Sequence, residues 1–187
     1  MSSLDDQQVI YARRQFLAVP LAGTLVWLFI AIAAIFLPLQ VMPWVLFAGT
    51  GSIFYIGIFL SNLLGEPIFD KQREKNCFDQ LFLMVLCMAL LVYAIAIPFF
   101  LVQPDSLPLS IGILTGLMWL PFSWSIKHWL GIFHALTRTL GVLLVWYLFP
   151  QQRYLAVAIV IMAVYLVTLW LLRRRWLLLP KQAAHTP

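Results

Sequence analysis

Six long apolar runs constrain the fold of this chain more than any other feature of its sequence. They cover residues 16–37, 44–64, 81–102, 109–126, 129–149 and 154–172, with short polar segments between them. An α-helix rises about 1.5 Å per residue, so about 20 residues cross the roughly 30 Å hydrocarbon core of a bilayer. Charged residues make up only 10% of the chain, against roughly a quarter in soluble domains. We therefore predict an all-α integral membrane protein with six transmembrane helices.

The same boundaries predict the domain organisation. Residues 1–15 form a polar N-terminal tail, residues 16–172 the six-helix transmembrane domain, and residues 173–187 a basic C-terminal tail. The polar segments are too short and scattered for a separate soluble domain. Because they are short, consecutive helices are expected to run antiparallel, as helical hairpins.

The distribution of lysine and arginine predicts how the helices lie in the membrane. With six helices, ten basic residues fall on the face that carries both termini: Arg13, Arg14, Lys71, Arg73, Lys75, Lys127, Arg173, Arg174, Arg175 and Lys181. Arg153 alone falls on the opposite face. Loops rich in lysine and arginine stay in the cytoplasm, so both termini are expected there. The net charge of +5 is thus explained by orientation, and we expect no nucleic-acid partner.

An internal repeat is suggested by a shift of 65 residues, which lays the first predicted hairpin on the second. The shift gives nine identities over positions 15–51, including Ile30-Ala31-Ile32 on Ile95-Ala96-Ile97 and Thr50-Gly51 on Thr115-Gly116. Such a repeat would relate two-helix units in parallel orientation, as in some transporters. Apolar composition alone also raises the number of chance identities, so both interpretations, a true repeat and a chance similarity, remain open.

Arg138 is the one clear charged residue inside a run. It follows His128 by ten residues, which places it about 15 Å along a helix, near the middle of the membrane. A charge at that depth costs about 2.5–3.5 kcal/mol to insert, so it is by default a candidate functional residue. The acidic residues all fall in tails, loops or run ends: Asp5, Asp6, Glu66, Asp70, Glu74, Asp79 and Asp105. We therefore expect no carboxylate at the depth of Arg138.

The expected partners of Arg138 lie in the preceding run. Positions equally far from the turn at Lys127-His128 lie at the same depth in two antiparallel helices, so Arg138 is expected level with Leu117. The carbonyl of Leu117 loses its helical donor because Pro121 has no N–H. Arg138 is predicted to donate to the carbonyl of Leu117, or to Thr115, Ser123 or a water beside them, and to pack on the ring face of Trp119.

Helical spacing places two stripes of small and polar residues face to face. One stripe consists of Gly131, His134, Arg138 and Gly141, and the other of Gly112, Gly116, Trp119 and Ser123. Gly112 and Gly116 form a GxxxG pair, which permits close approach of helices. The stripes could line a polar pocket, with Arg138 anchoring an anion and His134 titrating near neutral pH. They could equally form a packing seam in which Arg138 and His134 tie down the helix kinked at Pro121.

Motifs for catalysis or for cofactors are not found. His128 and His134 are six residues apart and fall on different helix faces, which argues against a haem or metal pair. Cys77 and Cys87 have no metal-ligand spacing, and the mixed-charge loop of residues 65–80 is expected to be solvated. We expect no cofactor and no bound metal.

Several segments together resemble a family of small bacterial membrane proteins catalogued as a domain of unknown function. They are TG in the second run, KQREKN, GLMWLPFSWSIKHW, GIFHALTR, the FP before residue 151 and YLAVAIVIMAVYL. The resemblance covers nearly the whole chain after the polar tail. It implies a single domain and an address in the bacterial inner (cytoplasmic) membrane, and it supplies no activity.

Three classes of function remain. The first is a transporter or channel for a small solute or anion, using a polar pocket that contains Arg138, His134, Trp119, Ser123 and Thr115. The second is a non-transporting membrane protein that packs against itself or a partner, with Pro121, Gly112, Gly116, Gly131 and Gly141 serving the packing. The third, a lipid-modifying enzyme, would have only His128, Ser123, Ser125 and the loop acids near the interface. The sequence favours the first class, with the bilayer and a small anion as its partners.

Overall fold

The computed structural model describes residues 3–70 and 74–179, and their secondary structure is helical throughout. The helices have these bounds: α1 Leu4–Ala12, α2 Ala18–Phe36, α3 Met42–Leu63, α4 Cys77–Leu91, α5 Tyr93–Val102, η1 Pro104–Ser106, α6 Leu107–Leu114, α7 Trp119–Ser125, α8 Leu130–Leu148 and α9 Arg153–Leu178. Grouped by span, they give six helical segments long and apolar enough to cross a membrane. The prediction of an all-α fold with six such segments is confirmed.

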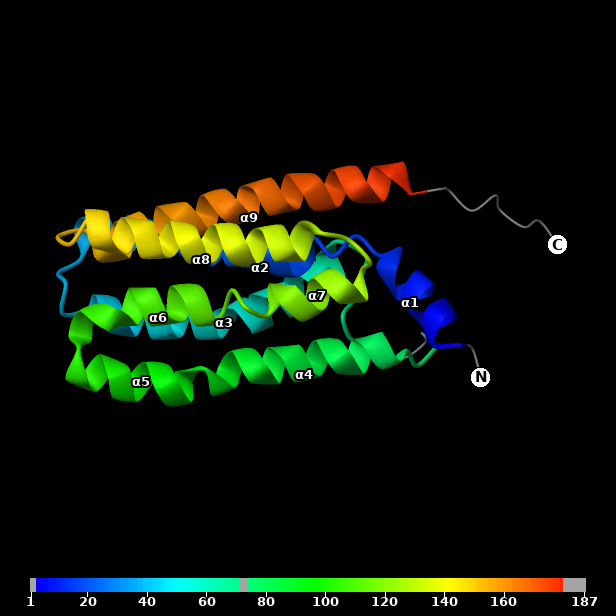
Figure 1. Ribbon diagram of the computed structural model, residues 1–187, viewed down its shortest axis with the longest axis horizontal. Helices are drawn as coiled ribbons and strands as arrows, with labels where there is room; N and C mark the ends of the chain where they lie inside the picture. The colour runs from blue at the N-terminus through cyan, green and yellow to red at the C-terminus, as the bar shows by residue number, and fades with distance from the viewer. Residues whose placement is uncertain (1–2, 71–73, 180–187) are drawn as a thin grey trace.

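The spans lie side by side along the long axis of the molecule, and α1 lies across one end (Figure 1). The end with α1 also carries the C-terminal end of α9, and we call it the α1 end. Helix α2 packs against both α3 and α9, and α8 packs against α9 and the α6–α7 pair. The span made of α4 and α5 lies at the edge and touches mainly α1, α6 and α7.

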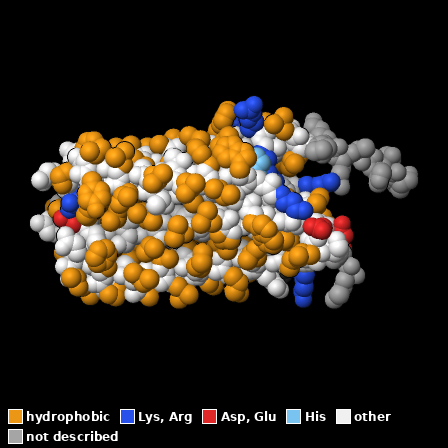
Figure 2. All heavy atoms as spheres, in the orientation of Figure 1, with side chains coloured by type: hydrophobic (Ala, Val, Ile, Leu, Met, Phe, Trp, Pro, Cys, Tyr) orange, Lys and Arg blue, Asp and Glu red, His pale blue; other side chains and the backbone are white. Residues whose placement is uncertain are grey.

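The surface agrees with a bilayer as solvent. Hydrophobic side chains cover most of the visible length of the bundle, and charged side chains gather at its two ends (Figure 2). The core is mostly apolar, with Trp27, Ile30, Leu130 and Ile161 fully enclosed, and it also contains buried polar residues. This distribution is typical of a multi-pass membrane protein.

The fourth span is broken in the middle. Helix α6 ends at Leu114, residues 115–118 form turns, and α7 begins at Trp119. Pro121 lies just inside α7, where its ring would clash with the carbonyl of Leu117 in a continuous helix. Irregular backbone at membrane depth is tolerated only where protein buries it or a cavity accepts it. The break therefore requires polar partners nearby, and it lies beside Arg138.

Both tails carry more helix than the apolar pattern indicated. Residues 4–12 form α1, which begins with a capping box between Ser3 and Asp6. At the other end of the chain α9 continues to Leu178, beyond Leu172 where the last apolar run ends. The loop after α3 is not simply solvated either, because Glu66, Asn76 and Asp79 bond to residues 7–16.

Candidate functional site

Arg138 lies in the middle of the bundle, with 1% of its surface exposed. Its Nε donates to the carbonyl of Gly112 at 2.7 Å, one terminal nitrogen donates to the Thr115 hydroxyl at 2.7 Å, and the other to the Tyr165 hydroxyl at 3.3 Å. Thr115 is thus one of the predicted partners. The hydrogen bonds of Arg138 join three spans, because Gly112 and Thr115 belong to the fourth, Arg138 to α8 and Tyr165 to α9.

The carbonyl that Arg138 uses is that of Gly112, and not that of Leu117, which was one of the predicted alternatives. In an α-helix the N–H of Gly116 would bond to Gly112, but here it bonds to the carbonyl of Ile113 at 2.9 Å. The carbonyl of Leu117 instead accepts from the N–H of Leu120 at 3.0 Å. The turns of residues 115–118 thus leave the carbonyl of Gly112 free to accept from Arg138.

His134 is fully buried one turn from Arg138 on α8. The hydroxyl of Thr168 donates to the carbonyl of Val164 at 2.7 Å, so it can only accept from Nδ1–H of His134, at 2.8 Å. The imidazole stacks on the ring of Trp119, with centroids 4.0 Å apart and planes 19° apart. Nδ1 is therefore the protonated nitrogen, and Trp119 covers one face of the ring.

Trp119 was expected on Arg138, yet it stacks on His134 instead. The guanidinium of Arg138 lies over two other rings, with its Cζ 5.7 Å from the centroid of Trp27 and 5.6 Å from that of Tyr165. These distances suit cation–π attraction. Ser123 serves the turn between α7 and α8, where its hydroxyl donates to the carbonyl of His128 and accepts from the N–H of Ile132.

Sequence reasoning missed Trp27, Tyr165 and Thr168. Tyr165 and Thr168 could have been found from their depth in the membrane, because positions equally far from the turn near residue 151 lie at the same depth in two antiparallel helices. By that count Arg138 lies level with position 164 and His134 level with position 168, beside the hydroxyls to which they bond. Trp27 belongs to a span distant in sequence, and no pattern in the chain pointed to it.

Among the described residues, no acidic side chain forms an ion pair with Arg138. The ion pairs found among the described residues are Arg14–Asp79, Lys127–Asp5 and Arg153–Asp105, none of which involves Arg138. A guanidinium has five N–H groups, and described residues accept three of those of Arg138. Three ring nitrogens are buried without a hydrogen-bond partner in the described part of the chain: Nε1 of Trp27, whose ring lies under the guanidinium, and Trp119 Nε1 and His134 Nε2, whose rings stack on each other.

Glycines allow the spans to approach closely around this centre. A Cβ placed on Gly131 would overlap the carbonyl oxygen of Trp119 and lie 2.7 Å from Cβ of Ser123. A Cβ on Gly116 would lie 2.9 Å from Cδ of Arg138, and one on Gly112 would lie 3.1 Å from Val142. Gly141 faces Val160 of α9 at 2.8 Å, rather than α6. Thus α7 and α8 touch almost backbone to backbone at Gly131.

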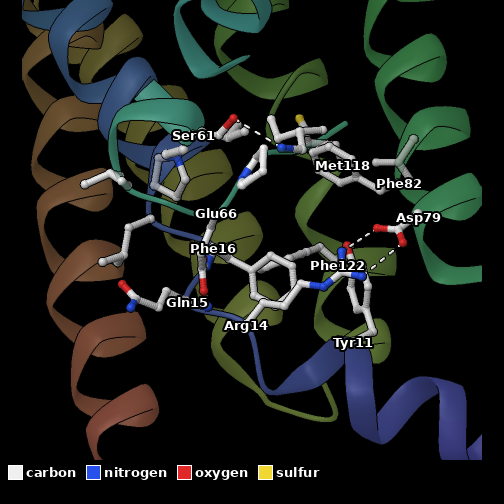
Figure 3. A pocket seen from close by; sticks show the side chains of 18 of the residues that line it. Tyr11, Arg14, Gln15, Phe16, Ser61, Glu66, Asp79, Phe82, Met118 and Phe122 are labelled. Atoms are coloured by element: carbon white, nitrogen blue, oxygen red, sulfur yellow. Dashed lines mark hydrogen bonds and ion pairs between the residues drawn. The ribbon is translucent and has the colours of Figure 1, made fainter. Parts of the chain in front are cut away.

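A cavity of about 80 Å³ lies beside this centre, towards the α1 end (Figure 3). Its walls are mostly apolar and come from α2 and α3 on one side and from α4 and α7 on the other. Trp119, Met118 and Phe122 form its boundary towards the bundle interior, whereas Arg138 and His134 do not line it. The ring of Trp119 therefore separates the cavity from the Arg138 centre.

Charged residues line the α1 end of the cavity. Arg14 pairs with Asp79 through both carboxylate oxygens, one of them at 3.0 Å. The carboxylate of Glu66 accepts from the N–H groups of Gln15 at 2.9 Å and Phe16 at 3.3 Å. Phe16 has a φ of 59°, in the left-handed region, which turns the two N–H groups towards one anion.

No three His, Cys, Asp or Glu side chains in the described part of the chain lie close enough to hold a metal ion.

Comparison with known proteins identifies the family of this chain. No curated protein and no solved structure matches the chain. A family of unknown function (DUF7010) matches residues 7–175. Because this match covers far more than half of the sequence and the six-span fold accompanies it, the chain belongs to the DUF7010 family.

Proposed function

We propose that this protein binds a small univalent anion at Arg138 and carries it across the cytoplasmic membrane. The observation that carries the proposal is a fully buried arginine to which no ion pair of the described residues contributes a carboxylate. An unpaired charge in a low-dielectric interior is costly, and one bound negative charge would neutralise it.

Hydrogen-bond donors of Arg138 and of buried tryptophans in the bundle core support an anion as the ligand. Two N–H groups of the guanidinium are left after its three hydrogen bonds, and the indole N–H groups of Trp27 and Trp119 are buried and unpartnered in the described structure. All of these are donors, which suits an acceptor such as chloride, nitrate or formate. The broken span beside the centre adds support, since interrupted helices at mid-membrane are a feature of transporter binding sites.

A non-transporting packing role is the second candidate, and a specific observation favours it. Each nitrogen of Arg138 already has one hydrogen bond, and together these bonds hold α6, α8 and α9 at the break. In that role the protein would pack against itself or a partner subunit, and Arg138 would act through stability alone. The two candidate functions differ in whether the protein transports anions and is stabilised by binding them.

Anion flux into proteoliposomes separates the candidates. Chloride, nitrate and formate are tested one at a time, with wild-type protein, Arg138→Met and Arg153→Gln. Transport predicts saturable flux of at least one anion. It also predicts a loss of about tenfold or more in Arg138→Met, since truncating one partner of a buried charge pair costs about 2–5 kcal/mol. Arg153 pairs with Asp105 at the far end of the bundle and serves as the matched control, with flux within about twofold of wild type.

Melting temperatures of the same proteins complete the test. A bound anion should raise the Tm of wild-type protein and leave that of Arg138→Met unchanged. If none of the three anions moves faster than through protein-free liposomes and none changes the Tm, the transport proposal is wrong. A lowered Tm of Arg138→Met in that case supports the packing role.

A further inference from the structure

The cavity at the α1 end has the character of a site for an amphiphile. Apolar side chains such as Phe82, Val85 and Phe122 form most of its wall, and its charged residues are Arg14, Glu66 and Asp79. All three charged residues lie at helix ends or in the segments that join helices, at the level where head groups meet the protein. Small-molecule sites commonly combine apolar walls with a few fixed polar groups.

The polar end of the cavity presents both signs of charge. Two carboxylates, Glu66 and Asp79, stand beside one guanidinium, that of Arg14. Glu66 is fixed in place by backbone N–H groups, and Asp79 by Arg14, so both keep their positions without a ligand. Burial raises the pKa of Tyr11, whose ring lies under Arg14 and remains neutral. An anionic head group would meet two negative charges here, whereas a zwitterionic one could satisfy both signs.

A bilayer lipid would reach the cavity between α3 and α4. Helix α3 is bridged to α5 nearer the far end, by the hydrogen bond between Thr50 and Tyr93 and by the packing of Phe47 on Tyr93. On the α1 side of this bridge, α3 and α4 form opposite walls of the cavity (Figure 3). A volume of about 80 Å³ exceeds the roughly 10–15 Å³ that one water needs, so part of an acyl chain fits.

We propose that this cavity binds one zwitterionic membrane amphiphile of the phosphatidylethanolamine type. Its ammonium group lies at Glu66 and Asp79, its phosphate at Arg14, and one chain runs along Val85 and Phe82. The proposal does not depend on anion transport, because the cavity and the Arg138 centre share only Trp119 as a wall.

Neighbouring residues on α4 provide a matched pair of variants. Val85 lines the cavity with 7% of its surface exposed, and Met84 faces outwards with 64% exposed. Val85→Trp should fill the cavity and abolish retention of the lipid, whereas Met84→Trp adds the same ring outside it. Lipid bound to each purified protein is counted by native mass spectrometry after exchange into mixed phosphatidylethanolamine and phosphatidylglycerol. Equal retention by the two variants would overturn the proposal.

The head group is tested first on the wild-type protein and then on one conservative variant. Short-chain phosphatidylethanolamine should raise the Tm of wild-type protein more than phosphatidylglycerol with the same chains. Glu66→Gln keeps an acceptor for the N–H groups of Gln15 and Phe16 but removes the charge, so it should reduce this difference. An equal response of wild-type protein to both lipids, or a stronger one to phosphatidylglycerol, would show that the assigned ligand is wrong.

Discussion

Three arginines of this chain show how burial decides what a guanidinium requires. Arg14 and Arg153 lie near the ends of the bundle, and each pairs with an aspartate. Arg138 lies at its centre and bonds to hydroxyls and one backbone carbonyl. The hydroxyl of Thr115 already donates to the carbonyl of Ile111 at 2.6 Å, so its burial costs little, whereas burying a carboxylate at that depth would itself be costly. The arginine is thus solvated by dipoles of the neighbouring spans.

His128, at the turn between α7 and α8, should make stability depend on pH. Burial, followed by the charge of Arg175, lowers the pKa of His128 below 6.5, and its Nδ1 accepts from the N–H of Leu130 at 3.2 Å. Below the unfolded pKa the unfolded chain therefore binds a proton that the folded protein does not, and stability is lost as pH falls. We expect the Tm of wild-type protein to drop between pH 7.5 and 5.5 more than that of His128→Gln. Parallel pH profiles of the two proteins would contradict this.

At the scale of elements, the contact between α7 and α8 depends on Gly131. Alanine there would place a methyl group on the carbonyl oxygen of Trp119, which is backbone and cannot rotate away. We expect Gly131→Ala to cost about 1–3 kcal/mol, a typical cost of overpacking, measured as a lower Tm. A methyl group on Gly51 of α3 would meet nothing within 4 Å, so Gly51→Ala serves as the control and should be neutral or slightly stabilising. A Gly131→Ala protein as stable as Gly51→Ala would refute this contact.

Most elements could be predicted from the sequence, because six apolar runs of membrane length admit few other folds. The stripe on α8 was also readable, since Gly131, His134 and Arg138 repeat with helical spacing and are all buried. Helix α1 could not be predicted from the sequence, because its apolar residues form no continuous face and its position depends on bonds to Trp124 and Asn76. The cavity could not be predicted either, because the residues that line it come from separate segments of the chain.

For the whole molecule, the bias in basic residues predicts that the α1 end faces the cytoplasm. Ten of the eleven lysines and arginines outside Arg138 fall on that side, counted from the sequence. We expect a fluorescent protein fused to either terminus to fluoresce, and alkaline phosphatase inserted after Gln151, at the α8–α9 turn, to be active. The reverse pattern, with an active phosphatase at both termini, would show the opposite orientation.

The bonds that hold α1 have a consequence for how this protein assembles. Arg175, near the end of α9, donates to the carbonyls of Ala12 and Arg14, and Gln8 donates to the carbonyl of Trp124 at 2.8 Å. Helix α1 is translated before the other described helices, yet two of the residues that bond to it, Trp124 and Arg175, are made more than a hundred positions later. The contacts of α1 are therefore completed only after the C-terminal part of α9 has been translated.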